Sequence, residues 1–299
     1  MIRFGLCCVF LNEPIKFSTT TAASLGKLDR AAGLAKLSAI GLANAGSLRS
    51  ALTYCAANGI GCFRVNSQIL PLKTHPLLGY NVEDLPNSDQ VVARFKECGD
   101  FVRAHGLRTC FHPDQFVVLN SKRADVVDSS LRELEYQAEV AEWIGADVIN
   151  VHGGGAFGDK PTALADFARA LDRLSPRARE RLTVENDDRV FTPADLLPVC
   201  RSTGVPLVYD VHHHRCRPDG LSVEEATTAA LATWNREPLL HISSPIDGWT
   251  GARPERHHDF IDTTDFPDCW RSLDVTVEVE AKAKEVAVLR LKGDLARRI

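Results

Sequence analysis

Short, nearly continuous apolar runs alternate along the chain with longer stretches in which apolar residues recur at helical spacing. The short runs predict eight β-strands, and the longer stretches predict the helices between them. The third to sixth runs are apolar at almost every position, as is typical of strands buried on both faces. The predicted strands are Ile2–Cys7, Cys62–Val65, Leu107–Phe111, Asp147–Val151, Leu182–Val184, Pro206–Tyr209, Leu239–Ile242 and Val275–Val279. The predicted helices span residues 33–57, 88–104, 123–143, 160–173, 193–201, 222–234 and 264–272, and a last helix follows residue 281.

The order of these elements indicates the fold class. A strand followed by a helix, repeated along the chain, is typical of an α/β protein whose parallel strands close into a (β/α)8 TIM barrel. The chain has 299 residues, an ordinary size for one such barrel, and neither a linker nor an internal repeat interrupts it. We therefore expect residues 1–299 to form a single domain, with the long loops 66–87 and 243–263 on its binding face.

Composition excludes several classes of protein. No apolar run is long enough for a membrane span, and the first residues are typical of a strand and not of a secretory signal. The nine cysteines include no CxxC pair, which favours reduced thiols over a zinc ribbon or a disulfide framework. We therefore expect a cytoplasmic monomer without a membrane partner. The formal net charge of −4 argues weakly against a nucleic-acid binder, but bound divalent cations would reverse its sign locally.

Residues of the types that bind metals stand at the ends of six predicted strands. Each one is the last residue of its strand, lies next to that end, or follows the strand at once: His112, His152, Glu185, Asp210, His241 and Glu280. In a barrel these strand ends meet at one mouth, where active sites form. The sequence therefore predicts that six side chains far apart in the chain converge.

The ordinary interpretation of any one of them is different. A single histidine at a strand end is usually a hydrogen-bonded loop residue, and a single carboxylate is usually a helix cap or a surface charge. Six together would repel one another or lose solvation at high cost unless a cation paired them. Imidazole and carboxylate without thiolate suit Mn, Zn or Fe, and the set is large enough for a pair of metals bridged by a carboxylate.

Further histidines lie in the loops beside these strand ends. His75 stands in the loop after the second strand, His212 to His214 follow Asp210, and His257 and His258 follow the seventh strand. Three consecutive side chains diverge, so we expect one metal ligand among His212 to His214 and two histidines that are solvated or support the ligands.

The motifs around these residues, taken in order, resemble the UV damage endonuclease family. They are Phe111-His112-Pro113-Asp114-Gln115-Phe116, Val151-His152-Gly153-Gly154, Val184-Glu185-Asn186-Asp187-Asp188, Asp210-Val211-His212-His213-His214, Leu240-His241-Ile242-Ser243 and Val279-Glu280-Ala281-Lys282-Ala283-Lys284-Glu285. The order and spacing fit from residue 1 to about 290, and six motifs in order are specific where one would be weak.

The resemblance implies a barrel related to endonuclease IV and a substrate of damaged double-stranded DNA. The implied reaction is metal-assisted cleavage of the phosphodiester immediately 5′ to pyrimidine dimers and 6-4 photoproducts, often also at abasic sites, leaving a 3′-hydroxyl and a 5′-phosphate. The implied cofactor is roughly two to three divalent ions. Manganese is the metal expected, and zinc is the other candidate.

The resemblance also implies roles for particular residues. His112, His152 and Glu185 would hold one metal; Glu185, Asp210, His241 and Glu280 would hold a second; His213 and His257 would hold a third. Glu185 and Glu280 would thus act at the catalytic centre, with His75 near the scissile phosphate. Gln115 and Phe116 would wedge into the duplex, although Phe116 in the core is the alternative. Lys282 and Lys284 would meet phosphates, with a solvated helix start as the alternative.

Three positions depart from the pattern of better-known members. The resemblance implies that Leu6 contacts the lesion, at a position where some members have an aromatic residue that probes it. Phe116 stands where some have tyrosine, and Leu239 where some have a chemically modified lysine. These changes bear on lesion range and rate rather than on phosphodiester chemistry.

Two other functions remain open from the sequence. A sugar isomerase or epimerase of the xylose isomerase type also places Glu, Asp and His around divalent metals at strand ends. A metal-binding protein that recognises damage without cutting is the second alternative. The number of histidines and the His-Pro-x-Gln-Phe motif favour the nuclease.

Overall fold

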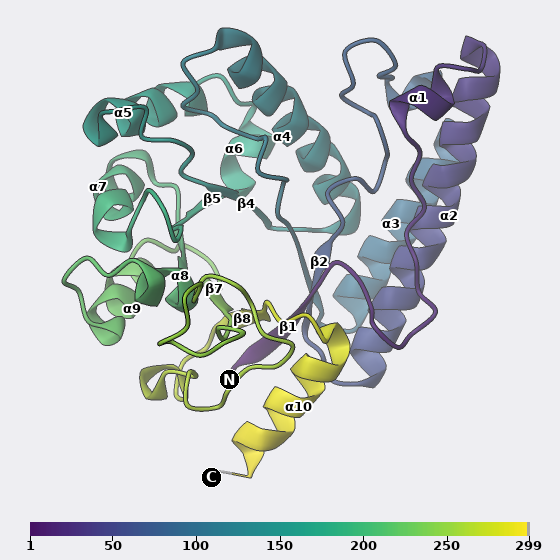
Figure 1. Cartoon of the computed structure of the whole chain (residues 1–299). Coiled ribbons are helices and arrows are strands. Elements are labelled where there is room, and N and C mark those ends of the chain that lie inside the picture. Colours follow the sequence, from purple (N-terminus) through teal and green to yellow (C-terminus); the bar gives the residue numbers. More distant parts are fainter. Residues whose placement is uncertain (298–299) are drawn as a thin grey trace.

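Eight parallel strands close into a barrel in the computed structural model, which describes residues 1–297 (Figure 1). Each strand pairs with the next along the chain, and β1 closes the ring by pairing with β8, with Leu6 opposite Val279. The strands are β1 (Arg3–Cys7), β2 (Cys62–Val65), β3 (Arg108–Phe111), β4 (Val148–His152), β5 (Leu182–Glu185), β6 (Leu207–Asp210), β7 (Leu239–Ile242) and β8 (Thr276–Val279). The predicted TIM barrel is confirmed.

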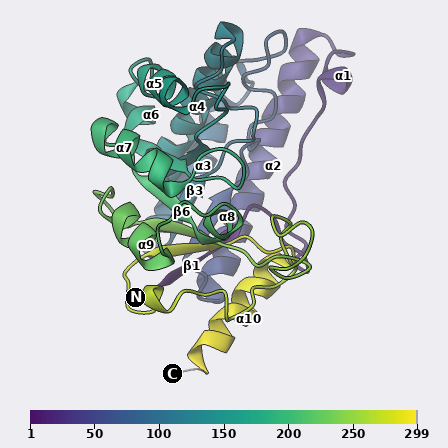
Figure 2. The same cartoon turned by 60° about the vertical axis from the view of Figure 1, so that its left-hand side comes forward.

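Helices surround this ring, with the long α2 and its neighbour α3 forming a wall along one side (Figures 1 and 2). The α-helices are α1 (Ala22–Leu25), α2 (Arg30–Ala57), α3 (Ser88–Ala104), α4 (Ala124–Ile144), α5 (Lys160–Leu171), α6 (Pro176–Arg181), α7 (Pro193–Thr203), α8 (Val211–Cys216), α9 (Val223–Leu231) and α10 (Lys284–Ala296). Two 3-10 turns, Val82–Asp84 and Asp268–Trp270, complete the described elements. No helix among the described residues combines the length and hydropathy needed to cross a bilayer.

The predicted helix over residues 264–272 is wrong. Only the 3-10 turn Asp268–Trp270 forms there, and Pro267 precedes it with an extended backbone (φ −64°, ψ 131°). A residue before proline is pushed out of the helical region, so a helix cannot run through this segment. The short helices α1, α6 and α8 were not predicted, and α8 begins directly where β6 ends.

Side chains on the strands alternate between the helices and the barrel interior. Leu6, Phe63 and Phe111 are fully or almost fully buried in the main core. The interior holds a second, smaller apolar cluster made of Cys62, Cys110, Val148, Val208 and Leu239. The middle of the barrel is therefore packed, and it also holds buried polar side chains, among them Arg64 and Glu278.

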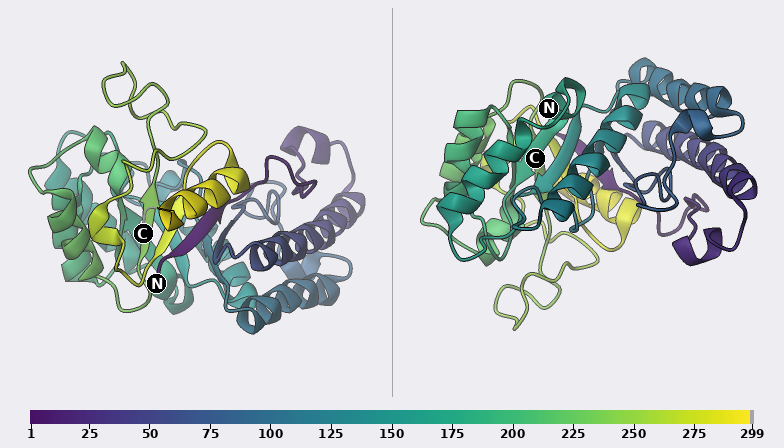
Figure 3. Two further views of the ribbon diagram at one scale, coloured as in Figure 1. Left: turned by 90° about the horizontal axis from the view of Figure 1, so that it is seen from below. Right: turned by 90° about the horizontal axis from the view of Figure 1, so that it is seen from above.

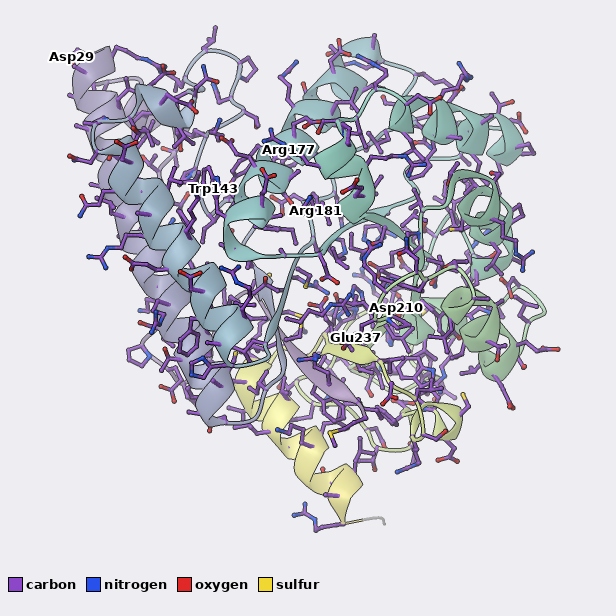
Figure 4. The ribbon with its side chains drawn as sticks, turned by 180° about the vertical axis from the view of Figure 1, so that it is seen from behind. Asp29, Trp143, Arg177, Arg181, Asp210 and Glu237 are labelled. Carbon is purple, nitrogen blue, oxygen red and sulfur yellow. The ribbon has the colours of Figure 1, made fainter. Side chains whose placement is uncertain are left out.

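Asp210 and Glu237, both labelled in Figure 4, stand at opposite ends of their strands, because Asp210 ends β6 and Glu237 comes before β7. Glu237 precedes β7 and binds Arg3 at the amino-terminal end of the strands, where Nε of Arg3 lies 2.8 Å from Oε1 of Glu237. Asp210 ends β6 at the carboxyl-terminal end, which we call the mouth. The predicted ligands belong to the mouth.

The loop after β7 makes a long excursion away from the barrel before it returns to the mouth (Figure 3). An isolated antiparallel bridge between Pro245 and His257 closes the excursion at its base. The backbone N–H of His258 donates to the carbonyl of Ser244 at 2.7 Å. This closure brings His257 back beside the strand that carries His241.

Candidate metal centre

The six strand-end residues converge at the mouth, as predicted. Their ligand atoms form three groups within 4.8 Å: His112 with His152 and Glu185, Glu185 with Asp210 and His213, and Asp210 with His241 and Glu280. Glu185 belongs to two of these groups and Asp210 to two, so the groups are continuous. Residues from β3 to β8 thus share one site although they are distant in sequence.

Glu185 lies at the centre of this site and is almost fully buried. Its Oε2 lies 3.0 Å from Nε2 of His112, and its Oε1 lies 3.1 Å from Nδ1 of His241 and 3.3 Å from Nδ1 of His213. The side-chain amide of Asn150 donates to Oε2 at 2.5 Å and fixes the carboxylate from the β4 side. A carboxylate with one oxygen toward each group is suited to bridge two cations.

Asp210 and His213 are placed by the start of α8. The backbone N–H of His213 donates to Oδ1 of Asp210 at 2.8 Å, so the aspartate caps the helix with one oxygen. Its second oxygen, Oδ2, lies 3.5 Å from Nδ1 of His213. The cap therefore fixes both residues in one turn and keeps one carboxylate oxygen toward the site.

Glu280 lies between the inner histidines and the outer loop. Its Oε1 lies 3.5 Å from Nδ1 of His241, and its Oε2 lies 3.8 Å from Nδ1 of His257. The ring of His257 is 6.3 Å from that of His213. His257 is about a quarter exposed, so the two residues proposed for a third metal lie at the solvent side of the site.

Three buried polar atoms in this site test whether it fits metal ions. Nδ1 of His152, Oδ2 of Asp210 and Nδ1 of His241 are buried and make no aligned hydrogen bond. Buried polar atoms are almost always hydrogen-bonded, so atoms left over in one place need another partner. Imidazole nitrogens and carboxylate oxygens are common ligands of divalent cations, so the side chains at the mouth are suited to hold divalent metal ions.

The charges of these side chains agree with that fit. Burial opposes ionisation of Glu185, but His241 and His152 hold its pKa well below the usual range. Burial disfavours the imidazolium of His241, yet Glu185 and its other carboxylate neighbours raise the pKa of His241 to about 10. In the metal-free site, the proton on His241 thus provides positive charge next to Glu185, which a bound metal ion would provide in the loaded protein.

A buried arginine supports the site from below. Arg64 on β2 donates through Nε to Oε2 of Glu278 at 2.8 Å and through Nη2 to Oε1 of Glu280 at 2.6 Å. Nε2 of His241 lies 2.9 Å from Oε2 of Glu278 and 3.1 Å from Nη2 of Arg64. Glu278 is therefore the acceptor for His241 Nε2–H, which leaves His241 Nδ1 toward Glu185.

Cys62, Cys110 and Glu278 form a fourth group of potential ligands deeper in the barrel. Sγ of Cys110 lies 2.9 Å from Oε1 of Glu278, and burial raises the pKa of the Cys110 thiol well above its usual range. Burial opposes ionisation of Glu278, but Arg64 and His241 lower its pKa to about 2. Because the guanidinium already neutralises this carboxylate, the group is explained without a cation.

Comparison with known proteins places this geometry in a family. The model of the UV-endonuclease UvdE family matches residues 2–299. The chain belongs to the UV-endonuclease UvdE family. It is 34% identical to a UV DNA damage endonuclease of Deinococcus radiodurans, over 97% of this chain and 94% of that protein. It is 31% identical to one from Bacillus velezensis, over 99% of this chain and 94% of that protein.

Solved structures agree with the family. A crystal structure of SacUVDE superposes with a TM-score of 0.88 at 28% identity, over 100% of this chain and 99% of that chain. Endonuclease IV from Thermus thermophilus gives a TM-score of 0.62 at 16% identity, over 99% of this chain and 100% of that chain. D-psicose 3-epimerase from Clostridium cellulolyticum gives 0.57 at 12% identity, over 84% of this chain and 93% of that chain, which shows a shared fold alone.

Gln115 and Phe116 are both exposed in the loop after β3, and Phe116 is 59% exposed. The alternative that placed Phe116 in the core is therefore wrong. A cavity of about 240 Å³ is lined by Gln115, by His152 and by residues 187–190 of the loop after β5. The expected wedge residue thus adjoins a cavity that reaches a candidate metal ligand.

The other expected DNA contacts differ in exposure. Lys282 is exposed and Lys284 half-buried at the start of α10. Leu6 is fully buried and packs in the core between strands and helices, because its neighbour Gly5 takes the inward position. Leu6 has no surface to offer DNA, so its position does not support the expected lesion contact. Leu239 is fully buried in the inner cluster.

His75 is held by its own turn, where Nδ1 accepts from the backbone N–H groups of Leu77 and Leu78 at 3.2 Å. It lines a broad groove between the loop after β2 and helices α4 and α6. The structure gives it no contact with the groups of candidate ligands. Its role near a phosphate stays a prediction.

Among the three consecutive histidines, His213 is the one in the ligand groups, as expected. The other two are not solvated. His214 donates or accepts at both ring nitrogens, 2.8 Å from the Tyr209 hydroxyl and 2.9 Å from Asp219. His212 is fully buried and packs between His257 and Trp249, with ring distances of 5.1 and 5.2 Å.

Arg64, Glu278 and Asn150 contact the candidate ligands but are not among the residues predicted from the sequence. Each is a polar residue in the middle of an otherwise apolar strand. Glu278 also stands two residues before Glu280, so strand alternation puts both carboxylates on one face. That alternation is the signal that could have found Glu278.

Proposed function

We propose that this protein is a UV DNA damage endonuclease that hydrolyses the phosphodiester immediately 5′ to pyrimidine dimers and 6-4 photoproducts, and also at abasic sites, leaving a 3′-hydroxyl and a 5′-phosphate. The observation that carries the proposal is Glu185, buried among His112, His213 and His241 at the mouth of a family barrel. Damaged duplex DNA is the proposed partner. The protein is proposed to act as a cytoplasmic monomer.

The proposed cofactor is a set of roughly two to three divalent ions, manganese first and zinc second. Glu185 would be shared by ions held by the inner ligands, and His213 and His257 would hold the outermost ion. Bound there, such ions supply Lewis-acid polarisation of the phosphodiester and a nucleophile at neutral pH. The inner ligands are His112, His152, Asp210, His241 and Glu280.

The protein's own residues supply orientation. Glu278 and Arg64 fix the ring of His241 and one oxygen of Glu280 through contacts of 2.6 to 3.1 Å. Gln115 and Phe116 would enter the duplex where a lesion has weakened stacking and made distortion cheaper. His75 and Lys282 would contact phosphates of the same duplex.

The sugar-isomerase alternative rests on the fold alone, because the epimerase structures share 12% identity with this chain. A metal-binding protein that recognises damage without cutting would share the donor set around Glu185, so a nicking assay is what distinguishes it from the nuclease.

A defined duplex with one 6-4 photoproduct tests the proposed reaction. The expected product is a single nick in the damaged strand whose 3′ end primes a polymerase and whose 5′ end is ligated without prior phosphorylation. A nick on the 3′ side of the lesion, a 3′-phosphate, or no nick in manganese or zinc would reject the proposal.

A further inference from the structure

Exposed large apolar side chains gather on the loops at the barrel mouth. Within residues 1–297, those on loops that follow a strand are Val9, Leu11, Leu77, Phe116, Phe157 and Trp249. Met1 and Leu28 are the remaining two in that set. We call these six residues the rim of the mouth, because each lies on a loop that leaves the carboxyl-terminal end of a strand.

Phe157 stands out on this rim because its backbone is strained. Its φ is +48°, in the left-handed region that disfavours a bulky side chain, and the side chain is 49% exposed. Five residues other than glycine have positive φ within the described chain: four lie in loops that follow a strand, and the fifth, Lys284, is the first residue of α10. Strain of this kind collects at functional sites, where the surrounding structure maintains it.

Asn120 holds the loop that carries Phe157. Its side-chain amide donates to the carbonyls of Gly153 and Gly155, each at 2.9 Å, and its Oδ1 accepts from the N–H of Gly155 at 3.2 Å. Gly154 has φ +83°, and a side-chain carbon there would collide with Oδ1 of Asn120. The loop is therefore built around a buried amide and offers Phe157 in a fixed place.

The ring of Phe157 covers backbone rather than filling the core. A side-chain carbon on Gly155 would lie 2.9 Å from Cζ of Phe157, so the ring lies on that glycine and leaves its other side to solvent. This small burial does not account for a bulky residue at positive φ, since glycine would relieve the strain.

The loop also adjoins the cavity that links Gln115 to His152, because Gly154 is part of the cavity wall. The β3 and β4 strands are neighbours, so Phe116 and Phe157 lie on neighbouring loops of the mouth. Two exposed aromatic rings on neighbouring loops are suited to contact bases on the two sides of one distortion.

We propose that Phe157 is a second aromatic contact for damaged DNA, which stacks on a base that the lesion has unstacked. The inference rests on the proposed function and adds a recognition residue to the Gln115–Phe116 pair. The ring's exposed side meets the base, and the Asn120-held loop resists its displacement. Binding energy from this stack is gained only with DNA, which is why the strain persists in the free protein.

Phe157→Gly tests the inference because it should lower DNA affinity without lowering the stability of the protein. It removes the strain, so the melting temperature of the metal-loaded protein should stay the same or rise. It also removes the ring, so affinity for a photoproduct duplex should fall by about 5- to 100-fold, the effect of one lost base stack. Metal content should not change. Phe157→Tyr keeps the ring and should keep the affinity.

His105→Ala is the matched control. The exposed ring of His105 stacks on Phe101 after the end of α3, next to Gly106, which accepts from Arg3 at the amino-terminal end of the barrel. The affinity of His105→Ala for the photoproduct duplex should equal that of the parent. Equal affinity of Phe157→Gly and parent, or a lowered melting temperature of Phe157→Gly, would overturn the inference. If the parent itself does not prefer the damaged duplex, the proposed function fails instead.

Discussion

Nε2 of His241 lies 2.9 Å from Oε2 of Glu278, a carboxylate that is fully enclosed in the barrel. This contact decides which ring nitrogen faces the ligand site, because the other nitrogen, Nδ1, is left toward Glu185. Arg64 neutralises the carboxylate and so makes its burial tolerable. The orientation of this candidate ligand thus depends on the ion pair of Arg64 and Glu278 beneath it.

Glu278→Gln should weaken metal binding by about 10- to 100-fold, because the histidine loses its charged acceptor while the volume is conserved. Titration of the chelated protein with manganese measures this affinity directly. The variant also leaves Arg64 without its full charge partner, so a loss of stability must be separated from the effect on the metal.

The double variant Arg64→Met with Glu278→Met makes that separation. Removing both members of a buried ion pair costs less stability than removing one. We expect it to recover part of the melting temperature but not the metal affinity. Parental affinity in the double variant would show that the pair has no part in orienting His241.

The metal-free protein should lose stability as pH rises. Burial disfavours the His241 imidazolium, but Glu185 raises its pKa from 6.5 to about 10 in the folded state. A raised pKa contributes stability that is fully present below the unfolded value of 6.5 and is lost as pH rises toward 10. Thermal unfolding in chelator across this window should show the decline.

His241→Asn is the control for this pH dependence, since it removes the titrating ring. Its melting temperature in chelator should change less across the same pH window than that of the parent. An identical decline in both proteins would mean that another group is responsible.

Phe116→Ala should weaken binding of a photoproduct duplex by about 5- to 100-fold while leaving metal content unchanged. The side chain is 59% exposed, so its removal creates no core cavity. Fluorescence anisotropy with damaged and undamaged duplexes measures the preference. Phe116→Tyr keeps the ring and should bind as the parent does; if Phe116→Ala does so too, the wedge is not used.

Lys282→Ala should reduce the salt dependence of DNA binding. Each phosphate contact contributes about 0.9 to the slope of log affinity against log salt concentration. Lys292 offers a control at the opposite end of the barrel, where its Nζ donates to the carbonyl of Asn58 at 3.2 Å. The slope for Lys292→Ala should match that of the parent. An unchanged slope for Lys282→Ala would show that Lys282 does not contact a phosphate.

The fold and the inner ligands could be predicted because strand periodicity is local. A residue that ends a parallel strand must lie at the mouth wherever its strand stands in the ring, so His112 and Glu185 could be placed without knowing their neighbours. The predicted helix at 264–272 is wrong for a local reason too, since Pro267 disfavours a helical backbone at the residue before it.

The layer below the ligands could not be predicted in the same way. Arg64 and Glu278 meet across the interior from β2 and β8, and their pairing depends on the barrel's register rather than on sequence spacing. The burial of Leu6 likewise depends on which face of β1 turns inward, and Gly5 takes that face because Glu278 and Cys62 crowd it. Resemblance to a family did not indicate which face of β1 turns into the barrel.

The metal content and nicking activity of Glu185→Ala test the central claim most directly. Parent protein should carry divalent metal, nick UV-irradiated supercoiled plasmid, lose that activity in chelator and regain it in manganese or zinc. Glu185→Ala should hold less metal and nick at least about a hundredfold more slowly. Glu237→Gln, at the other end of the barrel, should match the parent. Full metal content and parental nicking by Glu185→Ala would contradict the account.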